Sequence, residues 1–217
     1  MRRTAKTVLL GSLIVLCAVL ALKGAALLVP SGTWAPTANL TDARANSSAT
    51  LLSDGRILIT GGDGASGPLA TAEFFNRDGS VSAAAPINVA RSKHISIVLK
   101  DGRVLIAGGT VAGGGATNAA EIYDPTASTW GSLAGGMMEA RSGATAGLLQ
   151  DGRVVITGGQ NGSVVSSTIE VFDPVGGGFS FAGTLSSPRA QHATAVLADG
   201  RVVIIGGSNG NAPVAST

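Results

Sequence analysis

Cysteine is almost absent from this chain: Cys17 is the only one in 217 residues, and it lies inside an apolar N-terminal run. A disulfide framework is therefore excluded, and the rest of the chain must rely on its hydrophobic core. Histidine is nearly as scarce, with only His94 and His192. A metal centre needs three or four convergent ligands, and calcium needs a dense acidic loop. The sequence offers neither, so we expect no metal and no cofactor.

Charge is also low, because charged residues make up 13% of the chain. Four of the basic residues, Arg2, Arg3, Lys6 and Lys23, lie within the first 30 positions. Without them, 11 basic residues remain against 13 acidic ones, and the formal net charge changes from +2 to −2. Nucleic-acid binding needs a clustered basic face. We therefore expect no nucleic-acid partner.

Residues 1–30 differ in kind from the rest of the chain. A basic start precedes an apolar run from Val8 to Leu22, and Lys23 and the small residues Gly24 to Ala26 follow. This pattern is typical of a signal peptide or of an N-terminal signal anchor. The run is about 15 residues long, whereas a spanning helix needs about 20, so we favour cleavage. The pattern predicts an exported protein that is periplasmic, extracellular or anchored to the cell membrane by this segment.

One sequence unit recurs four times at steps of 47, 50 and 48 residues. Its repeated positions are the turns at Asp54, Asp101, Asp151 and Asp199, the glycine pairs Gly61-Gly62, Gly108-Gly109, Gly158-Gly159 and Gly206-Gly207, and the arginines Arg44, Arg91, Arg141 and Arg189. Repeats of this length indicate a propeller, a solenoid or an array.

Each unit reads as four short strands. Ile95 to Leu99 and Val104 to Ala107 flank an Asp-Gly pair, which predicts a hairpin with a type I′ turn. The second strand is continuously apolar, as in strands that are buried on both faces. A third strand carries Glu73, Glu121 or Glu170, and a fourth carries Trp130, Phe179 or Val81. Blades stacked around an axis bury both faces, so we predict an all-β fold, a β-propeller of four-stranded antiparallel blades.

The sequence resembles the kelch-repeat propeller family, of a bacterial type similar to the central propeller of galactose oxidase. The resemblance covers roughly residues 33–217. It is carried by the Gly-Gly pairs, the Glu-Xaa-Tyr/Phe-Asp-Pro segments, the spaced tryptophan, and the arginines followed three residues later by His94 and His192. It implies one four-stranded blade per repeat. It implies no single activity, because kelch propellers serve both as interaction modules and as enzymes.

The repeats define a propeller domain over residues 31–217 and divide it into blades at about 44–83, 91–133 and 141–183, with a partial blade at 189–217. Residues 33–40, which include Trp34, are predicted to form a closing fourth strand. By the spacing of the other repeats, the next glutamate would stand at position 218. We therefore expect an incomplete propeller, either an open arc or a strained four-blade ring.

The loops after the Gly-Gly pairs differ among the repeats and lie on the side that we call the top. Variable loops on a rigid scaffold are the usual place for function. The candidate ligand-contacting residues are Asp63, Gln160, Asn161, Ser208 and Asn209. The four arginines could ring the channel and bind an anion, but we favour structural ion pairs with Glu73, Glu121 and Glu170. The two histidines occupy one repeat position, where packing and hydrogen bonding are the usual roles.

These observations favour an exported scaffold that binds protein or carbohydrate ligands. One alternative is part of a sugar-modifying or oxidative enzyme whose catalytic residues lie outside this stretch, and another is a surface protein that self-associates. Copper radical oxidases of the galactose oxidase type need a Tyr–Cys crosslink and further tyrosine and histidine ligands. This chain has only Tyr123, and Cys17 lies in the export signal. We assign no catalytic, cofactor-binding or metal-binding residue.

Overall fold

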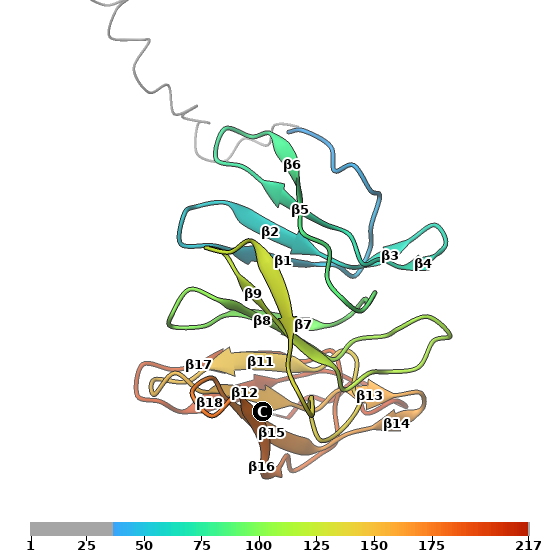
Figure 1. The fold of residues 1–217 in the computed structure, drawn as a ribbon. Helices are drawn as coiled ribbons and strands as arrows, with labels where there is room; N and C mark the ends of the chain where they lie inside the picture. Colours follow the sequence, from blue (N-terminus) through green and yellow to red (C-terminus); the bar gives the residue numbers. More distant parts are fainter. Residues whose placement is uncertain (1–36, 217) are drawn as a thin grey trace, which may run out of the picture. The chain divides into compact units, whose positions relative to one another are not determined.

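The structure is a computed structural model that describes residues 37–216 (Figure 1). In this part of the chain every regular element is a β-strand. No helix among these residues is long and apolar enough to cross a membrane. The predicted signal segment at 1–30 and the part of the predicted closing strand that contains Trp34 lie outside the described residues. Residues 37–40 belong to no strand.

Three four-stranded antiparallel sheets and one two-stranded sheet follow one another along the chain. Blade 1 consists of β1 (Ser48–Leu51), β2 (Ile57–Thr60), β5 (Ala72–Phe75) and β6 (Val81–Ala84). Blade 2 consists of β7 (Ile95–Val98), β8 (Val104–Ala107), β9 (Ala120–Asp124) and β10 (Thr129–Ser132). Blade 3 consists of β11 (Thr145–Leu148), β12 (Val154–Thr157), β15 (Thr168–Asp173) and β16 (Gly178–Thr184). Blade 4 consists of β17 (Ala193–Val196) and β18 (Val202–Ile205). The predicted propeller blades are confirmed.

Two short hairpins stand in the top loops of blades 1 and 3. They are β3 (Asp63–Gly64) with β4 (Gly67–Pro68), and β13 (Gln160–Asn161) with β14 (Val164–Val165). Isolated bridges join the residue after each repeat arginine to the residue after the glycine pair, as between Ala45 and Asp63. The arginine segments and the variable loops therefore lie on the same side of their blades.

The turn between the first two strands of each blade is not the type I′ turn that the sequence suggested. In blade 2 only Gly102 has a positive φ, at 86°, and Asp101 does not. Gly102 donates its N–H to the carbonyl of Leu99, and Leu99 donates to Arg103. This is the pattern of a three-residue loop whose glycine follows a type I turn. Asp101 instead accepts hydrogen bonds from the backbone and the side chain of Arg103.

The core lies between successive blades, because the second strands present apolar side chains to both faces. On β8, Val104 and Ile106 join a cluster with Phe74 of blade 1, while Leu105 faces a second cluster with Ile156 of blade 3. All four residues of β8 and all four of β12 are buried. The continuous apolar run that the sequence showed is thus explained by burial on both faces.

Backbone hydrogen bonds connect each blade to the next at the glycine pairs. The second glycine of one blade donates its N–H to the arginine carbonyl of the next blade: Gly62 to Arg91, Gly109 to Arg141 and Gly159 to Arg189, at 2.8–2.9 Å. So close an approach of two main chains leaves no room for a Cβ. A Cβ on Gly158 would overlap the carbonyl oxygen of Arg189 and lie 2.8 Å from the His192 ring.

A second series of inter-blade bonds runs through the residue two positions after each repeat arginine. Lys93 donates to the carbonyl of Asn46, Gly143 donates to Lys93, and Gln191 donates to Gly143. All four residues have φ between 52° and 62°. Three of them are not glycine, so each accepts a left-handed backbone that costs free energy. The inner strands then pack in succession, β1 on β7, β7 on β11 and β11 on β17.

Two glycines with nearly the same φ allow the close inter-blade approach to be tested. We expect Gly162→Ala to cost about 1 kcal/mol of unfolding free energy, because its φ is 58° but the space around it is open. We expect Gly158→Ala, with φ 57°, to cost about 1–3 kcal/mol more through overlap with Arg189. Urea unfolding of both variants measures the difference. Equal losses of unfolding free energy in the two variants would show that the inter-blade contact accommodates the added methyl group at no cost in stability.

Candidate functional site

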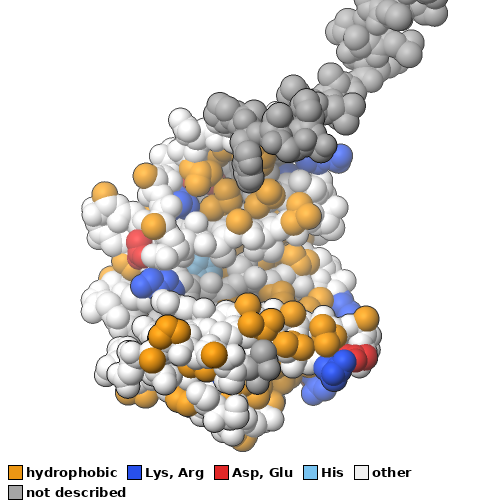
Figure 2. Space-filling model, turned by 180° about the vertical axis from the view of Figure 1, so that it is seen from behind, with side chains coloured by type: hydrophobic (Ala, Val, Ile, Leu, Met, Phe, Trp, Pro, Cys, Tyr) orange, Lys and Arg blue, Asp and Glu red, His pale blue; other side chains and the backbone are white. Residues whose placement is uncertain are grey.

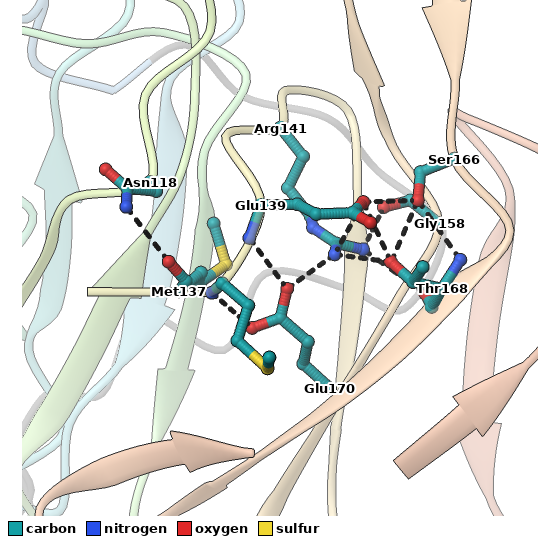
Figure 3. Close-up of polar contacts among 9 residues, drawn as sticks. Asn118, Met137, Glu139, Arg141, Gly158, Ser166, Thr168 and Glu170 are labelled. Carbon is teal, nitrogen blue, oxygen red and sulfur yellow. Dashed lines mark hydrogen bonds and ion pairs between the residues drawn. The ribbon is translucent and has the colours of Figure 1, made fainter. Parts of the chain in front are cut away.

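A buried arginine and glutamate join three segments of blade 3 (Figure 3). The Nη2 atom of Arg141 lies 2.5 Å from Oε1 of Glu170, and both side chains are 1% exposed. Arg141 also donates through Nη1 to the carbonyls of Gly158 and Thr168. Glu170 in turn accepts the backbone N–H groups of Met138 and Glu139. The pair is therefore embedded in a hydrogen-bonded network, which a buried ion pair requires.

The same arrangement recurs in the two preceding blades. Arg44 contacts Glu73 at 2.8 Å, and Arg91 contacts Glu121 at 2.7 Å. Burial lowers the pKa of Arg91, and Glu121 opposes that shift. The arginines of blades 1–3 are therefore buried in ion pairs within their own blades, as we favoured, and do not form an exposed cationic ring. Arg189 differs, since it contacts no carboxylate among residues 37–216.

The two histidines lie in the contacts between blades 1 and 2 and between blades 3 and 4. His94 Nε2 shares hydrogen bonds of 2.9 Å with the hydroxyls of Ser48 and Thr60, and His192 Nε2 shares one of 2.8 Å with Thr157. Burial, together with the charge of Arg91, lowers the pKa of His94 to about 3. Burial and the neighbouring arginine likewise lower the pKa of His192 to about 4. Both rings are neutral packing residues.

No group of three or more potential metal ligands occurs within residues 37–216. Tyr123, the tyrosine on which a radical-oxidase site would depend, is completely buried. It packs in the apolar cluster between blades 1 and 2, with its ring centroid 5.0 Å from that of Trp130 and 6.3 Å from that of Phe74. This surrounding is a hydrophobic core and offers no access to a substrate.

A shallow groove beside the top hairpin of blade 3 is the best candidate for a ligand site. Its volume is about 470 Å³. The lining residues are Glu139, Ala140, Asn161, Val164, Val165, Ser166, Ser167 and Thr168. The groove thus combines one carboxylate, an amide and hydroxyl groups with two valines, and Val164 is 71% exposed. Such a mixture of apolar area and a few oriented polar groups is typical of binding sites.

Glu139 is held in position at the edge of this groove. Its Oε2 accepts hydrogen bonds from Ser166 at 2.7 Å and Thr168 at 2.9 Å, and lies 3.2 Å from Nη2 of Arg141 (Figure 3). Partial burial alone would raise the pKa of the carboxyl, but the two hydroxyls and Arg141 outweigh burial and lower it. The side chain is 45% exposed, so it presents a fixed negative charge to solvent.

Sequence reasoning missed Glu139, although a signal was present. Glu139 stands two residues before Arg141, and Asp42 stands two residues before Arg44. Asp42 repeats the arrangement, because it accepts a hydrogen bond from Thr71 at 2.6 Å. An acid two residues before the repeat arginine, which only blades 1 and 3 have, distinguishes these two positions in the sequence, although the Asp-Gly-Arg turns show the same acid–Xaa–Arg spacing in every blade.

Asn161 is the predicted loop residue that lies in the groove. It is exposed, and its side-chain oxygen accepts the N–H of Ala116 from the blade 2 loop at 3.3 Å. Gln160, beside it, pairs its backbone with Ser142. Asp63 binds the side chain of Asn46 at 2.8 Å. The Ser92 and Asn46 side chains and the charge of Lys93 keep the pKa of Asp63 below its ordinary value.

The two predicted residues of blade 4 are occupied within their own loop. Asn209 accepts the N–H groups of Asn211 and Ala212, and Ser208 pairs its backbone with Ala190. The structure therefore does not bring the five predicted residues into one site.

The architecture defines the class of protein as a β-propeller assembled from antiparallel blades. Residues 140–186, which correspond to blade 3, match the Kelch motif family model. Residues 140–186 thus match the Kelch motif, and the blades have the propeller fold that the sequence resemblance to the kelch-repeat family implied.

A solved structure described as "Structure of YjhT" shares this fold at a TM-score of 0.66 and 16% sequence identity. The match covers 80% of this chain and 60% of that one, so the chain spans less than two thirds of its length. No curated protein matches the sequence. The fold supports either a binding scaffold or a propeller enzyme in general.

The buried histidines predict a loss of stability in mild acid. Because the folded-state pKa of His94 lies below the ordinary value of 6.5, its contribution is complete above about pH 6.5 and falls as the pH drops below it. For His94 the loss is about 2 kcal/mol between pH 7.5 and pH 5, where carboxylates scarcely titrate. Urea unfolding at several pH values should show this slope. It should flatten in His94→Gln, and an unchanged slope in His94→Gln/His192→Gln would contradict the assignment.

Proposed function

We propose that this protein is an exported kelch scaffold that binds a ligand through the groove beside β13 and β14. The observation that carries the proposal is the fixed carboxylate of Glu139 beside the exposed side chain of Val164. A carboxylate held by two hydroxyls loses little freedom when it receives a cation or a hydrogen-bond donor. The exposed valine adds apolar area that a ligand can cover.

A protein ligand fits this groove better than a carbohydrate does. The lining residues include two valines but no aromatic ring on which a sugar could stack. A lysine or arginine followed by an apolar side chain would satisfy both Glu139 and Val164. Because the loops of neighbouring blades approach one another here, as at Asn161 and Ala116, the surface available to a protein extends beyond one blade.

A screen of immobilised peptides and oligosaccharides with the purified full chain tests the proposal. We expect basic–apolar peptides to bind, and we expect Glu139→Gln and Val164→Ser each to weaken binding at least about tenfold, the equivalent of 1.4 kcal/mol. The matched controls are Asp42→Asn, the equivalent acid in blade 1, and Val175→Ser, at a residue that is 96% exposed and lies outside the groove. If the two control variants weakened binding as much as Glu139→Gln and Val164→Ser do, the groove would not be the binding site. Turnover of a sugar would contradict the scaffold role.

Export is the second part of the proposal, and it is supported by the basic start, the apolar run and the small residues of positions 1–30. Val15 stands in the middle of the apolar run, so Val15→Arg interrupts it with a charge, whereas the control Val15→Leu preserves it. We expect the intact chain and Val15→Leu to be translocated and Val15→Arg to remain inside the cell. Protease accessibility in spheroplasts, together with recovery of the chain from the culture medium, measures this. Equal protection of all three chains would contradict export.

A further inference from the structure

Blade 3 exposes several large hydrophobic side chains. Among residues 37–216, those of this blade and of the segment that leads into it are Met138, Val164, Val175 and Phe181, each more than half exposed. Hydrophobic side chains gather on the lower part of the face seen in Figure 2, where Figure 1 places blades 3 and 4. Val164 lines the groove at Glu139, whereas Met138 and Phe181 lie outside it.

Met138 and Phe181 occupy positions that are polar or small in the other complete blades. The residue three positions before each repeat arginine donates its backbone N–H to the buried glutamate, and these residues are Thr41, Asn88 and Met138. The outer-strand residues that pair with the same glutamates are Ala83, Ser132 and Phe181. Blade 3 alone of the three has a large hydrophobic residue at both positions.

The two positions are neighbours in space. In blade 2 the side-chain amide of Asn88 donates a hydrogen bond to the hydroxyl of Ser132 at 3.3 Å. The same two positions of blade 3 bring together Met138, which is 63% exposed, and Phe181, which is 57% exposed. Blade 3 therefore replaces a hydrogen-bonded polar pair by an exposed apolar pair, which we call the Met138–Phe181 pair.

This pair lies on the side of blade 3 that is turned toward blade 2. Met138 belongs to the connection between these two blades. Phe179, two residues before Phe181 on β16, packs in the apolar cluster that blades 2 and 3 share. Alternate residues of a strand point to the same face, so Phe181 also faces blade 2. Blade 2 is complete, and the exposure of the pair therefore does not depend on blade 4.

The Met138–Phe181 pair is continuous with the groove at Glu139. Glu139 directly follows Met138, and the backbone N–H groups of both bind Glu170 (Figure 3). Thr168, which lines the groove and binds Glu139, stands two residues before Glu170 on β15, a step of about 7 Å along one face. Glu139 therefore has the groove valines on one side and the Met138–Phe181 pair on the other.

The charge at this surface selects a cation. Arg141 is already neutralised by the buried carboxylate of Glu170, so the additional carboxylate of Glu139 leaves one unbalanced negative charge. The Glu139 side chain is 45% exposed and can reach a ligand. An anionic membrane would be repelled here, whereas a polypeptide with a basic side chain between two apolar ones complements the surface.

We infer that the groove and the Met138–Phe181 pair together bind one extended segment of a partner protein, in which a lysine or arginine stands between two hydrophobic residues at alternate positions. The inference rests on the proposed function and adds the second hydrophobic residue. Alternate residues of an extended chain are about 7 Å apart on one side, which matches the step from Thr168 to Glu170. Methionine adapts its shape and contacts aromatic rings favourably, so the added residue is aromatic.

Two synthetic peptides test this inference with the full chain, Ser-Phe-Ser-Lys-Ser-Val-Ser and the same peptide with alanine in place of phenylalanine. By fluorescence anisotropy, we expect the phenylalanine peptide to bind at least about tenfold more tightly, because its ring is removed from water. This advantage should disappear in Met138→Asn/Phe181→Ser, which introduces the blade 2 pair, and should persist in the control Val175→Ser. Urea unfolding should show equal stability of the double variant and the intact chain.

Equal affinity of the two peptides for the intact chain would overturn the inference, as would an advantage of the phenylalanine peptide that persists in the double variant. Glu139→Gln separates this result from the proposed function, because it should weaken both peptides alike. If it does so while the two peptides bind equally, the groove stands and the Met138–Phe181 pair has no part in binding. If Glu139→Gln has no effect, the groove itself is contradicted.

Two further measurements test the occupant. The first is sedimentation with vesicles of phosphatidylcholine and phosphatidylglycerol, and the second is light scattering of the chain alone. We expect neither vesicle binding nor a dimer that depends on the Met138–Phe181 pair. Vesicle binding that Met138→Asn/Phe181→Ser abolishes would assign the pair to a membrane, and a dimer that the same variant dissociates would assign it to a second copy. Either result would overturn the proposed occupant.

Discussion

A buried arginine holds each complete blade together, because one guanidinium joins the beginning, the middle and the third strand of the blade. Arg141 reaches Gly158, Thr168 and Glu170 from a single position before β11. The glutamate then fixes the backbone that leads into the arginine. Since all of these groups are buried, loss of either charge would leave the other without solvent or partner, a defect that typically costs about 3–5 kcal/mol.

The same arginine also connects its blade to the preceding one through its main chain. The carbonyl of Arg91 accepts the N–H of Gly62, while the side chain of Arg91 binds Glu121 within blade 2. Arg91 therefore takes part both in the contacts within blade 2 and in the contact between blades 1 and 2. The glycine pair is needed because any side chain at Gly61 would overlap that carbonyl. This coupling explains why the arginine and the glycine pair recur with the same spacing.

Odd-numbered and even-numbered blades differ in the residues and hairpins that they add to the shared repeat. Blades 1 and 3 carry the acids Asp42 and Glu139 and the short top hairpins, whereas blades 2 and 4 carry His94 and His192. The contacts between blades 1 and 2 and between blades 3 and 4 therefore include a buried histidine that hydrogen-bonds to hydroxyl groups, whereas Met137 is buried against Gly108 in the apolar cluster between blades 2 and 3. The side chains of Asp42 and Glu139 are 40% and 45% exposed, so each places a carboxylate at the surface beside its repeat arginine.

The repeat, the strands and the blade architecture could be predicted from the sequence, because a fixed spacing of Asp-Gly turns, glycine pairs and apolar runs leaves few ways to bury both faces of a strand. The Arg–Glu pairs could also be predicted, since both residues recur in phase. The turn type could not, because Asp-Gly fits both a type I′ turn and a turn with a single left-handed glycine at Gly102. Nor could the role of Glu139, which depends on Ser166 and Thr168 coming from a distant strand and loop.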